Sequence, residues 1–171
     1  MKKGRKRREW QHRQIKTLTD EITKCLNADL WYAALVLILI LPDICVSLEL
    51  PNGNTNGDLY EKWCEQWLAN EYGSLAKDLY YLRCGLAHEA KTQHRNIRSK
   101  RIFFTLGSKD AHMQKHKEAF TLDLNTFAED MTHAVEAWYA KNQRNQNVQK
   151  KIGALIRHHP SLDFLNVPAI G

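Results

Sequence analysis

Apolar side chains recur at helical spacing in four separate stretches of the chain. Residues 10–26 place theirs on one face, which predicts a first amphipathic helix. The same period marks residues 58–70 and residues 74–90, the latter with a regular stripe of leucines. A last amphipathic helix is expected to begin at an Asn125 cap and to end near residue 142.

A continuous apolar run at residues 30–41 predicts a buried helix over about residues 29–48. We expect Asp29 to cap this helix and Pro42 to kink it or open its last turns. The run has 12 residues, and a membrane span needs roughly 18–20, so a core helix is favoured over membrane insertion. The following segment PNGNTNG, residues 51–57, has the composition of a loop.

Two short segments of β type precede the last helix. Residues 101–106 (RIFFTL) and 119–124 (AFTLDL) are rich in β-branched and aromatic side chains, and they flank a loop rich in His and Lys. They are expected to pair as an antiparallel hairpin across that loop. The chain therefore predicts a mainly all-α fold, a bundle of about five helices with one small β-hairpin before the last long helix.

The length of 171 residues is enough for one domain with its own core. The formal net charge is +6, but it is unevenly spread: residues 1–16 carry eight basic residues against one acidic, and the rest of the chain is close to neutral. We therefore expect a basic arm at 1–16, a helical domain at 17–145 and a polar C-terminal tail at 146–171.

The basic arm has two interpretations. A short segment of like charge is most often disordered and solvated. It would also attract RNA or DNA by neutralising phosphates, without reading their sequence. The residues that would do so are Lys2, Lys3, Arg5, Lys6, Arg7 and Arg8. The segment that follows the arm is amphipathic and lacks the continuous apolar core of a signal peptide.

Neither the cysteines nor the histidines form a metal-binding pattern. The four cysteines lie about 20 residues apart with no C-x-x-C pair, which favours free thiols in a reducing cytoplasm. His112 and His116 have a spacing that can hold zinc on a helix, but the segment reads as a loop with no third ligand nearby. We expect no metal and no cofactor.

The segment LYYLRCGLAHEAK, residues 79–91, carries the most informative pair of side chains. Arg83 is always charged, and His88 belongs to the one residue type whose unperturbed pKa is close to neutral. Together they could stabilise developing charge and move a proton during phosphodiester cleavage. The spacing alone is not specific, because Arg7 and His12 have it too.

Five helical steps turn the chain by about 500°, so Arg83 and His88 point roughly 140° apart. A second half-apolar face, formed by Tyr81, Cys84 and His88, would meet itself in a two-fold dimer and bring two such pairs together. The alternative is that His88 bonds a backbone carbonyl and Arg83 makes an ordinary ion pair with Asp43 or Glu89.

The stretch LYYLRCGLAHE resembles the R-x(4–6)-H signature of the HEPN superfamily (higher eukaryotes and prokaryotes nucleotide-binding). The flanking stretches ALVLILILPDICVSLE, RIFFTL and FTLDLNTFAEDMTHAVEAWY resemble an uncharacterised bacterial and phage branch of it, over about residues 28–140. The resemblance implies an antiparallel four-helix core and a homodimer with paired motifs at a shared cleft. Many members are metal-independent endoribonucleases, often toxins or phage-defence proteins, and others are non-catalytic modules that bind RNA, a nucleotide or a protein.

Carried over by position, the catalytic residues implied are Arg83 and His88. His88 would act as general base or acid, and Arg83 would stabilise the phosphorane formed by attack of the ribose 2′-hydroxyl. Supporting roles are expected for Cys84, Glu89, Asp43 and Tyr81. Active members usually have Asn or Asp directly after the arginine, where this chain has Cys84. The partners implied are RNA, a second copy, and a cognate antitoxin or other regulatory protein.

Overall fold

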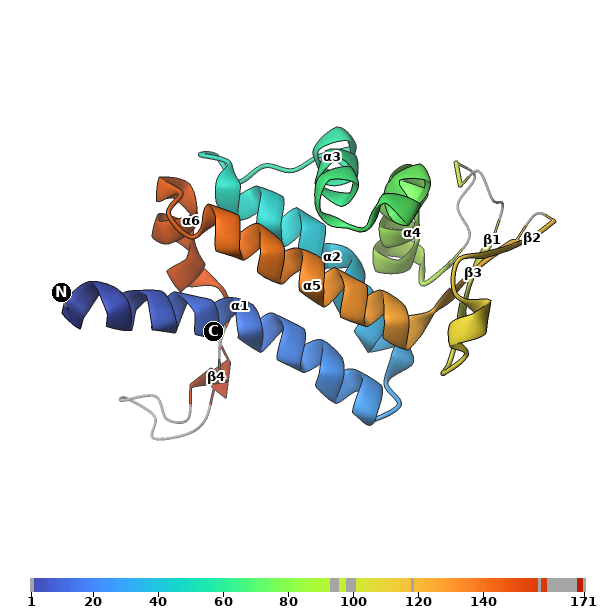
Figure 1. The fold of residues 1–171 in the computed structure, drawn as a ribbon, viewed down its shortest axis with the longest axis horizontal. Coiled ribbons are helices and arrows are strands. Elements are labelled where there is room, and N and C mark those ends of the chain that lie inside the picture. The colour runs from blue at the N-terminus through green and yellow to red at the C-terminus, as the bar shows by residue number, and fades with distance from the viewer. Residues whose placement is uncertain are drawn as a thin grey trace.

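The structure is a computed structural model that describes residues 2–92, 96–97, 101–117, 119–156, 158–159 and 169–170, with side chains between residues 14 and 156. The prediction of a mainly α-helical fold is confirmed (Figure 1). The helices in the described residues are α1 (Lys2–Asn27), α2 (Trp31–Glu49), α3 (Gly57–Trp67), α4 (Ala76–Glu89), α5 (Leu124–Asn142) and α6 (Gln146–Lys151), with the 3₁₀ turns η1 (Asn70–Leu75), η2 (Lys109–Ala111) and η3 (Ile152–Ala154). The strands are β1 (Arg101–Thr105), β2 (Gln114–His116), β3 (Ala119–Asp123), β4 (His158–His159) and β5 (Ala169–Ile170).

Helix α2 lies at the centre of the bundle and packs against α1, α3, α4, α5 and α6. Its side chains are apolar almost all round, which is the pattern of a helix that packs against neighbours on several sides. Asp29 does not cap it, contrary to prediction: Asp29 is in the left-handed region (φ 57°), and the cap position is Leu30. The helix also continues through the buried Pro42 to Glu49.

Within the described residues, α2 is the helix long and apolar enough to cross a membrane by length and composition. Half of its most apolar 18-residue window is buried inside the protein, against neighbouring helices. The packing of α2 against five other helices is that of a core helix, although α2 is longer than the apolar run from which it was predicted.

Helix α4 begins directly after η1, which lies at the boundary between the helices predicted over residues 58–70 and 74–90. Its leucine stripe faces the core as the spacing indicated, since Leu79, Leu82 and Leu86 are all buried. The helix ends at Glu89 and is followed by the cap residue Ala90, whose φ of 53° is left-handed. The N–H groups of Ala90 and Lys91 there donate to the carbonyls of Leu86 and Gly85.

The predicted antiparallel pairing of residues 101–106 with 119–124 is wrong. Strand β1 pairs with β3 in parallel, with Ile102 opposite Phe120, and the antiparallel partner of β3 is the short strand β2. The intervening chain, with η2 and β2, is long enough to cross over and return β3 in the direction of β1. Strand β2 has only exposed residues, so no apolar alternation marks it in the sequence.

Helix α5 is capped by Asp123 and not by Asn125 as predicted. The Asp123 carboxylate accepts hydrogen bonds from the Thr126 N–H and hydroxyl and from the Ser108 N–H. The side chain is fully buried, so it joins the end of β3, the loop after β1 and the first turn of α5. The sheet consequently lies at the end of the bundle where α5 begins (Figure 1).

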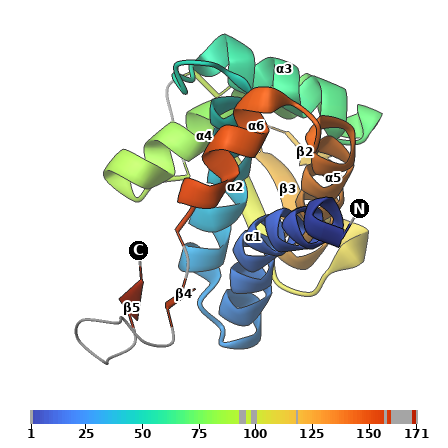
Figure 2. The ribbon, with the colours of Figure 1, turned by 90° about the vertical axis from the view of Figure 1, so that its left-hand side faces the viewer.

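Both ends of the predicted helical domain extend further than expected. Helix α1 begins at Lys2, so the backbone of the predicted arm is helical where we expected disorder. After residue 145, α6 and η3 bury Val148 and Ile152 in the core, where we expected a weakly structured tail. Figure 2, seen from the end opposite the sheet, shows α6 beside α2.

Candidate functional site

Arg83 lies on α4 and forms an ion pair with Asp43 of α2, with 2.7 Å between Nε and Oδ2. Their side chains are 26% and 12% exposed, so the pair lies at the edge of the core. Neither Nε nor Oδ2 has a hydrogen-bond partner in the described residues, which means that the two charges meet without the alignment of a hydrogen bond. The ion pair of Arg83 with Asp43, left open by the sequence, is thus formed.

The surroundings of Arg83 are aromatic and partly apolar. Burial lowers the pKa of the Arg83 guanidinium, but the Asp43 charge and the Cys84 side chain raise it more, and the net direction is upward. Tyr80 packs against Tyr60 with ring centroids 5.6 Å apart. Burial, followed by the neighbouring Cys84, raises the pKa of the Tyr80 phenol. Arg83 therefore stays charged and is held in place.

Two further residues that the sequence singled out lie beside Tyr80. Cys84 is half-buried, with its thiol beside the Tyr80 hydroxyl. Tyr81 is also half-buried, and its ring lies 5.6 Å from that of Tyr80 at an interplanar angle of 57°. Both residues thus belong to the partly covered face of α4 that we expected to meet another chain.

His88 lies in the last turn of α4 and is exposed. In the part of the chain that the structure describes, it makes no hydrogen bond or ion pair. The adjacent Glu89 is also exposed and pairs with Lys91, with 2.9 Å between Oε2 and Nζ, and so does not hold Arg83. Within one chain, Arg83 and His88 are therefore not brought together: Arg83 is fixed toward α2, and His88 is free in solvent.

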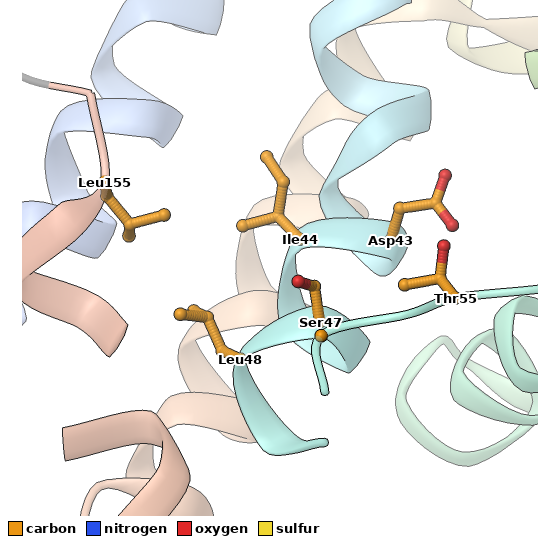
Figure 3. A pocket seen from close by; sticks show the side chains of 7 residues that line it. Asp43, Ile44, Ser47, Leu48, Thr55 and Leu155 are labelled. Atoms are coloured by element: carbon orange, nitrogen blue, oxygen red, sulfur yellow. The ribbon is translucent and has the colours of Figure 1, made fainter. Parts of the chain in front are cut away.

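A pocket of about 290 Å³ lies against α2, and the sequence did not predict it. It is formed by α2, the loop before α3 and the residue after η3, and Figure 3 shows six of its side chains: Asp43, Ile44, Ser47, Leu48, Thr55 and Leu155. Its polar groups are one carboxylate and two hydroxyls, on a largely aliphatic surface. Asp43 contributes to this pocket and to the ion pair, so the pocket adjoins the group that positions Arg83.

A second polar cluster joins η1, the turn before β2 and α5. Tyr72 donates its hydroxyl proton to Asp130 Oδ2 at 2.6 Å, and His112 Nε2 lies 2.9 Å from the same hydroxyl oxygen. The Asp123 N–H donates to His112 Nδ1 at 3.1 Å. Because Nδ1 accepts this bond, the proton of a neutral His112 is on Nε2, where it donates to Tyr72.

Ligand atoms of Glu71, His112 and Asp130 lie within 4.8 Å of one another, close enough to hold a metal ion. The tautomer of His112 argues against a metal ion, since its Nε2 carries a proton and its Nδ1 accepts a hydrogen bond from a backbone N–H. The predicted spacing partner, His116, is exposed on β2 and does not belong to the cluster. The residues therefore fit a hydrogen-bonded cluster that joins three segments better than they fit a metal site.

The predicted nucleic-acid arm lies in the first half of α1. The side chains of residues 2–13 are outside the described residues, so phosphate binding by this arm stays a prediction. Comparison with known proteins finds no family model, curated protein or solved structure that matches the chain. The function is therefore inferred from the arrangement of α4 and its neighbours.

Proposed function

We propose that the protein is a metal-independent endoribonuclease of HEPN type. The observation that carries the proposal is the contrast along α4: the Arg83 guanidinium is anchored by Asp43, whereas the His88 imidazole is exposed and unpaired among the described residues. A held cation and an accessible proton carrier are the two groups that phosphodiester cleavage requires.

In the proposed reaction, His88 removes the proton of the ribose 2′-hydroxyl next to the scissile phosphate, or donates a proton to the leaving 5′-oxygen. Arg83 stabilises the crowded, doubly charged phosphorane through its planar set of donors. The products are a 2′,3′-cyclic phosphate and a 5′-hydroxyl. DNA lacks the nucleophile, so it is not a substrate.

The proposal includes a homodimer, because Arg83 and His88 point about 140° apart on one straight helix. In a two-fold dimer the face of α4 with Tyr81, Cys84 and His88 meets its own copy, and two Arg83/His88 sets line one cleft. About a quarter of the Arg83 side chain is exposed, which leaves part of it accessible to such a cleft. Asp43 then acts as a positioning residue for Arg83.

The biological setting belongs to the same proposal. We place the protein in the cytoplasm, in a toxin or anti-phage role, with a cognate antitoxin or other regulatory protein as its partner. The basic residues of the first half of α1 would add sequence-independent attraction to RNA.

The second candidate is a catalytically silent HEPN-like module that binds RNA, a nucleotide or a protein. Two observations favour it: Cys84 stands where active members have a polar residue, and the charge of Arg83 is already paired with Asp43.

RNA cleavage in the presence of EDTA separates the two candidates. Wild-type protein is expected to cleave and His88→Ala to lose cleavage by a factor of roughly 10²–10⁴. His12→Ala is the matched control, because His12 ends the other R-x-x-x-x-H sequence, and it should cleave like wild type. Binding of RNA without cleavage by any of the three would select the silent module.

A further inference from the structure

An apolar groove of about 280 Å³ lies between the start of α2 and strand β1. Four of its side chains are unusually exposed for their type: Trp31 is 45% exposed, Tyr32 55%, Phe103 47% and Leu106 51%. None of its lining side chains is charged; the others are Leu35, Thr92, Ile102, Phe104 and Leu124. Several large aromatic side chains in one exposed groove indicate a binding surface more than a folding requirement.

The groove adjoins the end of α4 that carries His88. The Tyr32 hydroxyl donates a hydrogen bond to the Leu86 carbonyl at 3.0 Å, and Leu86 precedes His88 by two positions. Thr92, three positions after Glu89, also lines the groove. A ligand in the groove is therefore beside the last turn of α4.

The charge of the neighbouring sequence is one-sided. Residues 92–101 contain Arg95, Arg98, Lys100 and Arg101 and no acidic residue, whereas the preceding Lys91 is paired with Glu89. This segment starts at Thr92 and ends beside Ile102, so both of its ends are at the groove. Arg101 is itself exposed at the start of β1. Aromatic side chains next to a cationic stretch are the combination that binds single-stranded nucleic acid by base stacking and phosphate neutralisation.

We propose that this groove binds the bases of single-stranded RNA next to His88, with Trp31 and Phe103 as the stacking surfaces; the inference rests on the proposed function and adds a substrate-binding subsite to it. The charge argues for RNA over a second copy of the chain. In a two-fold contact the groove would face itself, and the exposed, positively charged Arg101 of each copy would lie beside the same contact.

The test is binding of short fluorescent oligo(U) and oligo(A) RNAs to the His88→Ala protein, measured by anisotropy at low salt. Adding Trp31→Ala or Phe103→Ala should weaken binding roughly 5- to 150-fold, the range for loss of one stacking partner. Trp31→Phe keeps an aromatic face and should bind nearly as well as its parent. Ile156→Ala removes an apolar side chain that is 58% exposed outside the groove, and it should have no effect.

The contribution of positive charge to RNA binding is tested by salt titration of the same complexes. Arg101→Ala should reduce the slope of log affinity against log salt by about one, with a similar loss for both RNAs. Unchanged RNA affinity in both Trp31→Ala and Phe103→Ala overturns the proposed RNA-binding role of the groove. A change in oligomeric mass with no change in RNA binding also overturns it and shows that the groove is a protein interface. RNA binding that depends on the groove without cleavage by wild type leaves this inference standing and refutes the nuclease.

Discussion

Arg83 Nε lies 2.7 Å from Asp43 Oδ2, so two charged groups join α4 to α2 at the edge of the core. Removal of one partner leaves the other charge partly buried and unpaired. Asp43→Asn and Arg83→Met are each expected to lower the free energy of unfolding by about 1–3 kcal/mol, less than for a fully buried pair because water reaches both side chains. Urea denaturation of both single variants and the double variant checks this. A double variant whose loss equals the sum of the single losses would show that the two groups do not interact.

Asp123 should make stability depend on acid pH. Burial alone raises the pKa of this carboxyl, but the hydrogen bonds from Thr126 and Ser108 lower it more, so its folded pKa is below the unfolded value of about 3.9. Its stabilising contribution is complete above that unfolded value and is lost as the pH falls through the lower folded pKa.

Asp123→Asn keeps the size of the cap but cannot titrate, so its stability should fall less steeply than that of wild type below about pH 4. Asp123→Ala, which leaves three donors without their acceptor, should cost about 1–2 kcal/mol or more at neutral pH. Thermal unfolding of the three proteins between acid and neutral pH measures both effects. Parallel pH profiles for wild type and Asp123→Asn would contradict the role assigned to this carboxylate.

The hydrogen bonds among Tyr72, His112 and Asp130 are predicted to stabilise the fold without a metal ion. Tyr72→Phe removes the hydroxyl that joins the other two side chains, and the free energy of unfolding should fall by about 1–2 kcal/mol. Zn²⁺ should leave the melting temperature of wild type unchanged, because the His112 tautomer has no free lone pair for it. A Zn²⁺-dependent rise in wild type that disappears in His112→Gln would show a metal site instead.

Ala90 ends α4 in the left-handed region, a conformation that costs a non-glycine residue about 1–2 kcal/mol. Ala90→Gly relieves this cost, and the greater freedom of glycine in the unfolded chain returns part of it. A net stabilisation of about 0.5–1 kcal/mol is expected. Chemical denaturation measures it, with Ala87→Gly as the control: Ala87 lies inside α4 and is exposed, so glycine there should destabilise.

The sequence was most informative where one physical requirement controls several residues. The spacing of Leu79, Leu82 and Leu86 predicted both α4 and its buried face, because a helix needs apolar residues at that period to pack. The length of the apolar run at residues 30–41 did not separate a core helix from a membrane span, because the whole of α2 is long and apolar enough to cross a membrane.

Elements with few apolar residues could not be predicted in this way. Strand β2 is wholly exposed, and α6 has a polar sequence that buries Val148. The direction of β1 relative to β3 depends on how the chain between them crosses over. The β-propensity of the residues in the two strands does not determine that path. The Tyr72–His112–Asp130 cluster combines three distant segments, so its residues have no common pattern in the sequence.

The most direct measurement is the identity of the RNA ends produced by wild-type protein in EDTA, on one oligoribonucleotide and on the same strand with a single 2′-deoxy nucleotide at the cleaved position. The mechanism predicts a 2′,3′-cyclic phosphate and a 5′-hydroxyl, no cleavage at the substituted position, and no cleavage of either strand by His88→Ala. Cleavage at the 2′-deoxy nucleotide, or equal cleavage by His88→Ala, would contradict it.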